Sequence, residues 1–201
     1  MRVDIRGKAF DGQPVLGPIA FEIGVAEAVA LTGPSGIGKS TLLRIIAGLD
    51  RDFDGKITGA GRLAMVFQEP TLMPWRSARD NIVLAADVSA PEADALLASV
   101  GLADKAGLFP TQLSLGQRRR VAIVRAFARR PETLLMDEPF TSLDAESSRG
   151  MQELLRGLLS ERPTRLILVT HDPRDAEALA TRRIHLDGAP ARVMDQSAVK
   201  N

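Results

Sequence analysis

The feature that most constrains this chain is a glycine-rich run, Gly33-Pro34-Ser35-Gly36-Ile37-Gly38-Lys39-Ser40-Thr41, which matches G-x-x-x-x-G-K-[ST] in full. The glycines let the backbone turn tightly, so that successive N–H groups converge on phosphate oxygens. Lys39 supplies a mobile charge for the β- and γ-phosphates, and Ser40 offers its hydroxyl to Mg²⁺. The alternative is a glycine loop that only turns the chain. The run follows an apolar segment and opens a helical pattern, which favours a phosphate site at a helix N-terminus.

A second motif places two acids at the end of an apolar segment, in Leu134-Leu135-Met136-Asp137-Glu138. Ligands of α/β sheets gather at the carboxyl ends of the strands. Asp137 is expected to hold Mg²⁺, and Glu138 to orient or deprotonate a water that attacks the γ-phosphate. Taken alone, the two acids are equally consistent with a solvated turn, because Asp-Glu-Pro is a common turn sequence. The phosphate loop in the same chain argues against that alternative.

The order of the predicted elements indicates an α/β protein. Strand patterns occupy residues 2–5, 19–23, 28–32, 63–67, 133–136, 165–170 and 183–186, and helical patterns occupy 39–48, 93–100, 115–130, 144–159 and 172–180. The almost unbroken apolar strands are typical of a parallel sheet that is covered on both faces. The stretch from about 72 to 130 carries helical patterns alone and is predicted to be a helical subdomain inserted into a single domain of residues 1–201.

Composition excludes several classes of protein. The chain has 201 residues, no cysteine and a net charge of +1, with 45% hydrophobic residues. Disulfides and thiolate metal sites are therefore excluded, and disorder is not expected. Near-neutrality argues against a nucleic-acid partner, so the arginines at 118–120, 125, 129 and 130 are expected to be solvated or paired within the domain. No apolar run approaches the ~20 residues of a membrane span, and no secretory signal is recognisable, so we expect a cytoplasmic protein.

Further motifs follow a family order. Leu113-Ser114-Leu115-Gly116-Gln117 opens an arginine-rich helix between the phosphate loop and the acidic pair. Phe10 is an aromatic residue upstream of the loop, and Gln68 follows a predicted strand. Asp144 ends a Ser-Leu-Asp tripeptide, and His171 follows another predicted strand. Together they resemble the ATP-binding cassette (ABC) ATPases over residues 2–190.

The resemblance implies a fold and a set of roles. The fold is a P-loop cassette with a mainly parallel core sheet, an N-terminal antiparallel β part and the inserted helical subdomain. ATP and Mg²⁺ are the implied ligands, bound in a head-to-tail homodimer in which Ser114, Gly116 and Gln117 of one copy meet the nucleotide of the other. Phe10 would stack on adenine, Gln68 would contact Mg²⁺ and the attacking water, His171 the γ-phosphate, and Asp144 would lie at the dimer interface.

Each of these residues also has an ordinary alternative. Phe10 has the alternative of an ordinary core aromatic, Gln68 that of a solvated loop residue, and Ser114 and His171 that of helix caps. The signature departs from the family pattern because Leu115 replaces the first of two glycines. Since Ser114 and Gly116 are kept, we predict a working signature and retained ATPase activity in a Leu115→Gly variant.

The function implied by the resemblance is the ATP-hydrolysing subunit of an ABC transporter. The loop from Phe67 to Arg76 is similar to that of cassettes for nitrate, sulfonate and taurine import, and its single tryptophan, Trp75, is either a docking surface for a permease or an internal packing residue. The expected partners are permease subunits at the inner face of the cell membrane, a second cassette and, indirectly, a solute-binding protein. A soluble or exporter-linked ABC ATPase and a non-hydrolysing regulatory module remain as alternatives.

Overall fold

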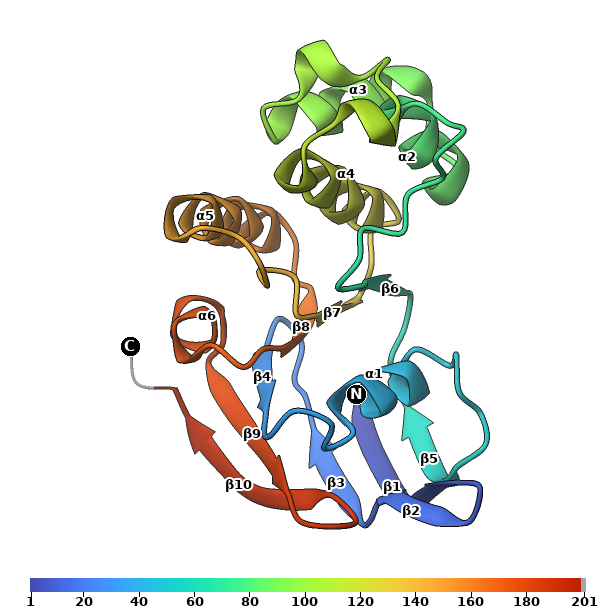
Figure 1. The fold of residues 1–201 in the computed structure, drawn as a ribbon, viewed down its shortest axis with the longest axis vertical. Helices are drawn as coiled ribbons and strands as arrows, with labels where there is room; N and C mark the ends of the chain where they lie inside the picture. Colours follow the sequence, from blue (N-terminus) through green and yellow to red (C-terminus); the bar gives the residue numbers. More distant parts are fainter. Residues whose placement is uncertain (200–201) are drawn as a thin grey trace.

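The computed structural model describes residues 1–199, which form two β-sheets and a helical region (Figure 1). The larger sheet has six strands in the order β10-β9-β4-β8-β7-β6. Neighbouring strands are parallel except for β10, which runs antiparallel to β9. The strands are β4 (Ala28–Thr32), β6 (Leu63–Val66), β7 (Thr133–Asp137), β8 (Arg165–Val169), β9 (Arg182–Asp187) and β10 (Arg192–Ala198).

The parallel strands are buried on both faces, as their apolar sequences predict. In β7, Leu134 and Met136 pack on one face beside α4 and α5, whereas Leu135 packs on the other face beside α1. Alternate residues of a strand point to opposite faces, so an unbroken apolar run is needed when both faces are covered. This arrangement brings the carboxyl ends of β4, β6, β7 and β8 to one edge of the sheet.

The smaller sheet is antiparallel and lies at the N-terminal part of the chain. It contains β1 (Arg2–Phe10), β2 (Gln13–Leu16), β3 (Ile19–Glu22) and β5 (Asp54–Thr58). Sequence patterns predicted only the first half of β1 and the strand β3. The missed hairpin β1–β2 turns through Asp11 and Gly12, with φ of 48° and 78°. An Asp-Gly turn with both φ values positive is a strong hairpin signal, so this strand could have been found.

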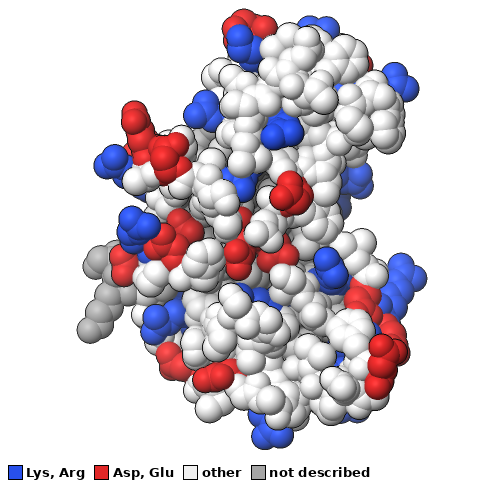
Figure 2. Space-filling view, viewed as in Figure 1, with Lys and Arg blue, Asp and Glu red and all other residues white. Residues whose placement is uncertain are grey.

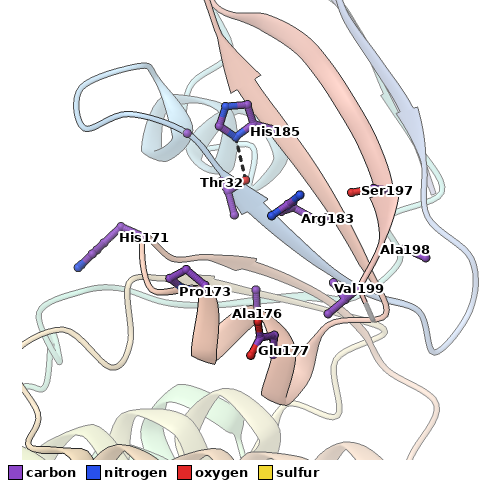
Figure 3. A pocket seen from close by; sticks show the side chains of 11 residues that line it. Thr32, His171, Pro173, Ala176, Glu177, Arg183, His185, Ser197, Ala198 and Val199 are labelled. Atoms are coloured by element: carbon purple, nitrogen blue, oxygen red, sulfur yellow. Dashed lines mark hydrogen bonds between the residues drawn. The ribbon is translucent and has the colours of Figure 1, made fainter. Parts of the chain in front are cut away.

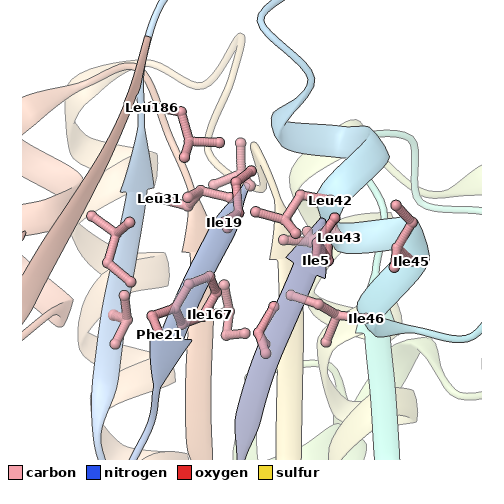
Figure 4. Packing of buried hydrophobic residues seen from close by; sticks show 14 of the residues in the cluster. Ile5, Ile19, Phe21, Leu31, Leu42, Leu43, Ile45, Ile46, Ile167 and Leu186 are labelled. Carbon is pink, nitrogen blue, oxygen red and sulfur yellow. The ribbon is translucent and has the colours of Figure 1, made fainter. Parts of the chain in front are cut away.

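Helix α1 (Lys39–Ile46) lies between the two sheets and joins them into one core. Figure 4 shows Leu42 and Leu43 of α1 beside Ile5 and Ile19 of the antiparallel sheet and Leu31 of β4. The phosphate loop therefore leads into a helix whose apolar side is completely buried, which fixes the direction of its N-terminus.

The helices between β6 and β7 form a separate layer above the sheets (Figure 1). They are α2 (Ala78–Ala86), α3 (Ala90–Ser99), the short 3₁₀ helices η1 (Ala103–Lys105) and η2 (Pro110–Gln112), and α4 (Leu115–Ala128). The prediction started α3 three residues late, because it overlooked the capping box of Ser89 and Glu92. Helix α4 is shared: Ile123 and Ala126 pack on the sheet, and Val121 and Val124 pack inside the helical layer.

Two helices complete the fold, α5 (Ala145–Glu161) and α6 (Pro173–Leu179). Met151 and Leu155 of α5 pack on the face of the sheet that α4 also covers, and Ala176 of α6 packs on Ala30 of β4. The predicted fold class, α/β with a mainly parallel sheet and an antiparallel N-terminal part, is confirmed. None of the helices formed by residues 1–199 combines the length and the apolar character that a membrane crossing demands.

Candidate active site

The phosphate loop has a backbone that only glycine permits at two positions. Gly33 has a φ of 143°, and a Cβ there would lie 2.3 Å from the carbonyl oxygen of Leu186. Gly38 has a φ of 106° and precedes α1, where a Cβ would lie 2.7 Å from Leu16 Cδ2. The loop residues Pro34, Ser35 and Gly36 are exposed, and Ile37 and Thr41 are half-buried. Because no side chain caps α1, its first N–H groups are available to an anion.

Lys39 is buried inside this loop. Its Nζ donates hydrogen bonds to the carbonyl oxygens of Gly33 and Pro34, each at 2.8 Å. Burial lowers the pKa of Lys39, and the carboxylates of Glu138 and Asp137 act in the opposite direction. The ammonium is thus held at the inner wall of the loop, where it is close to the acids of β7.

Ser40 and Asp137 meet across the site. Ser40 Oγ donates a hydrogen bond of 3.1 Å to Asp137 Oδ1. Burial raises the pKa of Asp137, whereas the bond from Ser40 lowers it. A hydroxyl and a carboxylate are hard oxygen donors of the kind that Mg²⁺ takes, usually completed by phosphates and water. Within residues 1–199 no three His, Cys, Asp or Glu side chains form a metal-binding group.

Glu138 and His171 form the next pair along the edge. His171 Nδ1 lies 3.3 Å from Glu138 Oε2, and Thr141 Oγ1 donates a hydrogen bond of 3.0 Å to the same oxygen. Glu138 has a φ of 45°, in the left-handed region, and its N–H donates to the carbonyl of Val169 at 2.9 Å. A non-glycine residue in this conformation is strained, and such strain is concentrated at functional sites. The carboxylate is only partly exposed, whereas the imidazole is largely exposed.

A buried carboxyl that the sequence analysis missed holds the segment before His171. Asp175 accepts hydrogen bonds from Thr170 Oγ1 at 2.7 Å and from Gln152 Nε2 of α5 at 2.8 Å. Burial raises the pKa of Asp175, and the two hydrogen bonds oppose that rise. The helix that follows is capped by Asp172, which accepts from the N–H of Arg174. His171 is therefore free of a capping role, and that alternative is wrong.

The loop after β6 brings Gln68 to the same edge. Strand register pairs Val66 with Met136, so Gln68 follows the end of β6 beside the acids of β7, and its side chain is exposed. Further along, Asn81 is completely buried and accepts from the N–H of Met73 at 2.8 Å while its amide donates to carbonyls of the same loop. We call these hydrogen bonds the Asn81 clamp, because they fix the loop that carries Trp75. Trp75 itself is 70% exposed, so internal packing of Trp75 is excluded.

The start of α4 lies on the surface. Ser114 and Gln117 form a capping box, in which Ser114 Oγ accepts from the N–H of Gln117 at 3.2 Å and Gln117 Oε1 accepts from the N–H of Ser114 at 2.9 Å. A Cβ added at Gly116 would meet nothing within 4 Å. The structure therefore shows that Ser114 caps α4, and the hydroxyl of Ser114 remains available as a hydrogen-bond donor. Asp144 is likewise exposed and caps α5 by accepting from Glu146 and Ser147 N–H groups.

Three arginines on α4 and at its C-cap donate hydrogen bonds within the chain, whereas the buried Arg119 has its Nε and Nη1 without a hydrogen-bond partner among residues 1–199, so it is neither solvated nor fully paired. Arg125 donates to the carbonyl of Thr71 at 2.9 Å, Arg129 to that of Ala85 at 2.7 Å, and Arg120 to that of Val100 at 3.3 Å. Figure 2 shows blue and red side chains interspersed on the viewed face, with acidic ones gathered between the helical layer and the sheets. The guanidinium groups thus tie the helical layer together.

Phe10 lies at the end of β1 and is 46% exposed, so a core role for this ring is excluded. Lys8 Nζ lies 4.4 Å from the centroid of the ring. The neighbouring strand touches the phosphate loop, since Leu16, which pairs with Lys8, lies against Gly38. Phe10 therefore belongs to the strand pair that lines the loop.

A cavity of about 580 Å³ lies behind the loop, between β9, β10 and α6 (Figure 3). Thr32, Gly33, His171 and His185 contribute to its wall, and Thr32 Oγ1 lies 3.1 Å from His185 Nδ1. Neither Lys39 nor Asp137 lines it. The cavity is therefore not the phosphate cradle, and His185 contacts Thr32 in its wall.

Comparisons with known proteins agree with this geometry. The family model described as "ABC transporter" matches residues 16–141. The chain is 44% identical over 193 residues to "Aliphatic sulfonates import ATP-binding protein SsuB" of Mycobacterium sp. (strain MCS), covering 92% of this chain and 79% of the relative. It is 41% identical to "Aliphatic sulfonates import ATP-binding protein SsuB 1" of Xanthomonas axonopodis pv. citri (strain 306), covering 96% and 83%.

A solved structure is similar along its whole length. It is described as "Dimeric structure of a post-hydrolysis state of the ATP-binding cassette MJ0796 bound to ADP and Pi" and matches with a TM-score of 0.85 and 27% identity. The alignment covers 100% of this chain and 99% of the other. The similarity therefore includes the sheets, the phosphate loop and the helical layer.

Proposed function

We propose the function of this chain from one premise: it belongs to the ABC transporter family. It is an ATP-binding subunit that hydrolyses ATP and uses Mg²⁺, and it powers a separate membrane permease that imports a small solute. The observation that carries this proposal is the meeting of the phosphate loop with the acids of β7, through Ser40 and Asp137 at 3.1 Å. The sheet edge thereby supplies phosphate donors, a cation site and a base in one place.

The contacts support a role for each group at the sheet edge. The loop N–H groups and Lys39 bind the phosphates, while Ser40, Asp137 and Gln68 hold Mg²⁺, which neutralises phosphate charge when bound. Glu138 accepts a proton from the attacking water, and His171, 3.3 Å from its carboxylate, contacts the γ-phosphate and keeps the base in line. The buried Asp175 network fixes the backbone from which His171 projects.

The second half of the site comes from another copy of the chain. Ser114 and Gly116 lie on the surface at the N-terminus of α4, where a helix offers N–H groups and a hydroxyl to an anion. In the proposed head-to-tail homodimer these groups, with Gln117, approach the γ-phosphate bound by the partner, and Asp144 lies near the interface. Loss of that phosphate on hydrolysis removes the contact, so the dimer reopens.

Coupling to the permease uses the loop that carries Trp75. The Asn81 clamp and the hydrogen bond from Arg125 to Thr71 fix the loop to the helical layer, so an exposed indole is held at a constant position. We expect Trp75→Ala to leave the ATPase activity of the isolated chain unchanged within twofold. Assembly with the permease should fall about tenfold or more in affinity, because an exposed tryptophan is a typical interface anchor. Co-purification of the two proteins measures this, and unchanged assembly would contradict docking through Trp75.

The relatives support the direction of transport and a class of solute. Both are named as import proteins for aliphatic sulfonates, so we propose import, with an aliphatic sulfonate delivered by a solute-binding protein. The chain then lies on the cytoplasmic side of the membrane, at the inner face of the permease. These names favour an importer over an exporter-linked or non-hydrolysing alternative.

A Glu138→Gln variant tests the proposed function. An amide cannot accept the proton of the water, so steady-state hydrolysis should fall more than ~10²-fold. Binding of ATP should persist, and the dimer should accumulate because its reopening depends on hydrolysis. Phosphate release and gel filtration with Mg·ATP measure the two effects, with Glu177→Gln on α6 as the control. Unchanged turnover in Glu138→Gln would refute the role of Glu138, and wild-type protein that neither binds nor hydrolyses ATP would refute the function.

A further inference from the structure

Lys8 is a buried cation whose position is fixed from several sides. Its side chain is only 3% exposed, and its Nζ lies 3.0 Å from a carboxylate oxygen of Asp50 and 3.2 Å from one of Asp52. It also donates a hydrogen bond of 2.6 Å to the carbonyl of Asp52. A lysine is flexible in solution, and here oxygens of Asp50 and Asp52 around one ammonium hold it in a single place.

The same ammonium lies over the ring of Phe10, 4.4 Å from its centroid. A cation within ~6 Å of an aromatic centroid is attracted to the face of the ring. Lys8 and Phe10 stand two positions apart on β1, and the pairing of β1 with β2 shifts register between Lys8 and Ala9. One face of the ring is thus covered by protein, while the residue as a whole is 46% exposed.

The location of this pair connects it to the phosphate site. Lys8 pairs with Leu16, whose Cδ2 would lie 2.7 Å from a Cβ at Gly38, and Asp50 follows α1, the helix that begins at Lys39. Lys8 therefore joins the strand beside the phosphate loop to the segment after the phosphate-loop helix.

We propose that Lys8 is a positioning residue that holds Phe10 as a one-sided platform, on which the purine base of the bound nucleoside triphosphate stacks against the face turned away from Lys8. This inference rests on the proposed function, because it assumes that the nucleotide occupies the phosphate loop. An aromatic ring that is already fixed loses little freedom on binding, so more of the stacking energy appears as affinity. A purine has more surface than a pyrimidine, so the platform also favours ATP over CTP.

The test separates the base from the phosphates. Dissociation constants are measured by calorimetry for Mg·ATP and for Mg·tripolyphosphate, which has no base, with wild type, Lys8→Met, Phe10→Leu and the double variant. We expect Lys8→Met to weaken ATP binding three- to tenfold and tripolyphosphate binding less than twofold, with kcat at saturating ATP unchanged. In the Phe10→Leu background, Lys8→Met should have no further effect on ATP binding. Lys56→Met, an exposed lysine on β5, is the control.

Other results would overturn the proposal. If Lys8→Met weakened the binding of ATP and of tripolyphosphate equally, Lys8 would act on the phosphate loop. If the fold-changes in ATP affinity of the two single variants multiplied in the double variant, Lys8 would not act through Phe10. If Lys8→Met does not fold, a variant with both Asp50→Asn and Asp52→Asn loosens Lys8 while keeping the size of both side chains, of which Asp50 is 19% and Asp52 95% exposed. That variant should weaken ATP binding at least twofold and spare tripolyphosphate, and the opposite result would overturn the proposal. Wild-type binding of neither ligand would instead refute the proposed function.

Discussion

The sheet edge and the start of α4 carry the two halves of the proposed site, and they differ in how far the chain itself completes them. At the sheet edge, Lys39, Asp137 and Glu138 are buried or partly buried: Lys39 contacts the loop before α1, Asp137 contacts Ser40 of α1, and Glu138 contacts His171 after β8. At the start of α4, Ser114 and Gly116 contact only their own helical turn or nothing. The first half is organised by folding, and in the proposed dimer the second half is completed by another copy of the chain.

The largest expected effect on hydrolysis comes from a substitution at the sheet edge, the first half of the proposed site. Lys39→Ala removes the ammonium that the loop holds between two carbonyls. We expect hydrolysis to fall more than ~10²-fold, as is typical when a principal charge contact to a reacting phosphate is lost. Steady-state phosphate release measures the loss, with Lys56→Ala as the control. Retained activity would mean that the sheet edge is not where the phosphates bind.

A smaller effect on hydrolysis is expected from a substitution at the start of α4, the second half of the proposed site. Gly116→Ala places a methyl group in open space on α4, so the free energy of unfolding should stay equal or rise by up to about 1 kcal/mol from helix propensity. ATPase activity should nevertheless fall about tenfold, because the methyl group would keep the helix from the partner's nucleotide. Thermal unfolding and ATPase assays measure the two quantities.

Leu115→Gly is the matched comparison on the same turn. It should keep ATPase activity within a few-fold, because the groups assigned to the nucleotide are unchanged. Full activity of Gly116→Ala would contradict the expected approach of a second copy, and loss of activity in Leu115→Gly would contradict the assignment of the contacts to Ser114 and Gly116.

The smallest effect concerns the buried carboxyl behind His171. The pKa of Asp175 is raised by burial above the value of about 3.9 expected in the unfolded chain. The folded state then binds this proton more tightly, so the contribution of Asp175 to stability is present at low pH and is lost as pH rises through the raised pKa. Asp175→Asn should remove that loss of stability. The melting temperature of the variant should therefore fall by a few degrees less than that of the wild type as pH rises. Calorimetry at several pH values measures the slope, and an unchanged slope would contradict the prediction.

Sequence patterns predicted the sheet edge better than its surroundings. The phosphate loop and the acids of β7 are contiguous motifs, and the unbroken apolar strands that carry them stand out from the sequence. Asp175 and Asn81 were missed because their importance depends on burial and, for Asp175, on a partner in another helix, Gln152 of α5. Strands β2 and β5 were missed because they are short and only partly buried, although the Asp11-Gly12 turn signalled β2.

The alternatives at single residues were decided by exposure and by hydrogen bonds. Phe10 and Trp75 had ordinary interpretations as core residues, and only their exposure excludes these. Ser114 illustrates the opposite case, since it is a helix cap and also has a donor to spare. A sequence pattern cannot separate two roles that one side chain performs together.

The capping of α5 by Asp144 has a consequence for genetics. This carboxylate accepts the N–H groups of Glu146 and Ser147 and the hydroxyl of Ser147, so it anchors the first turn of its own helix. An inactivating allele at codon 144 would therefore lower the amount of folded protein as well as any contact between copies. Complementation by overexpression would rescue the first defect and leave the second, so gene dosage is the way to tell which of them the allele reveals.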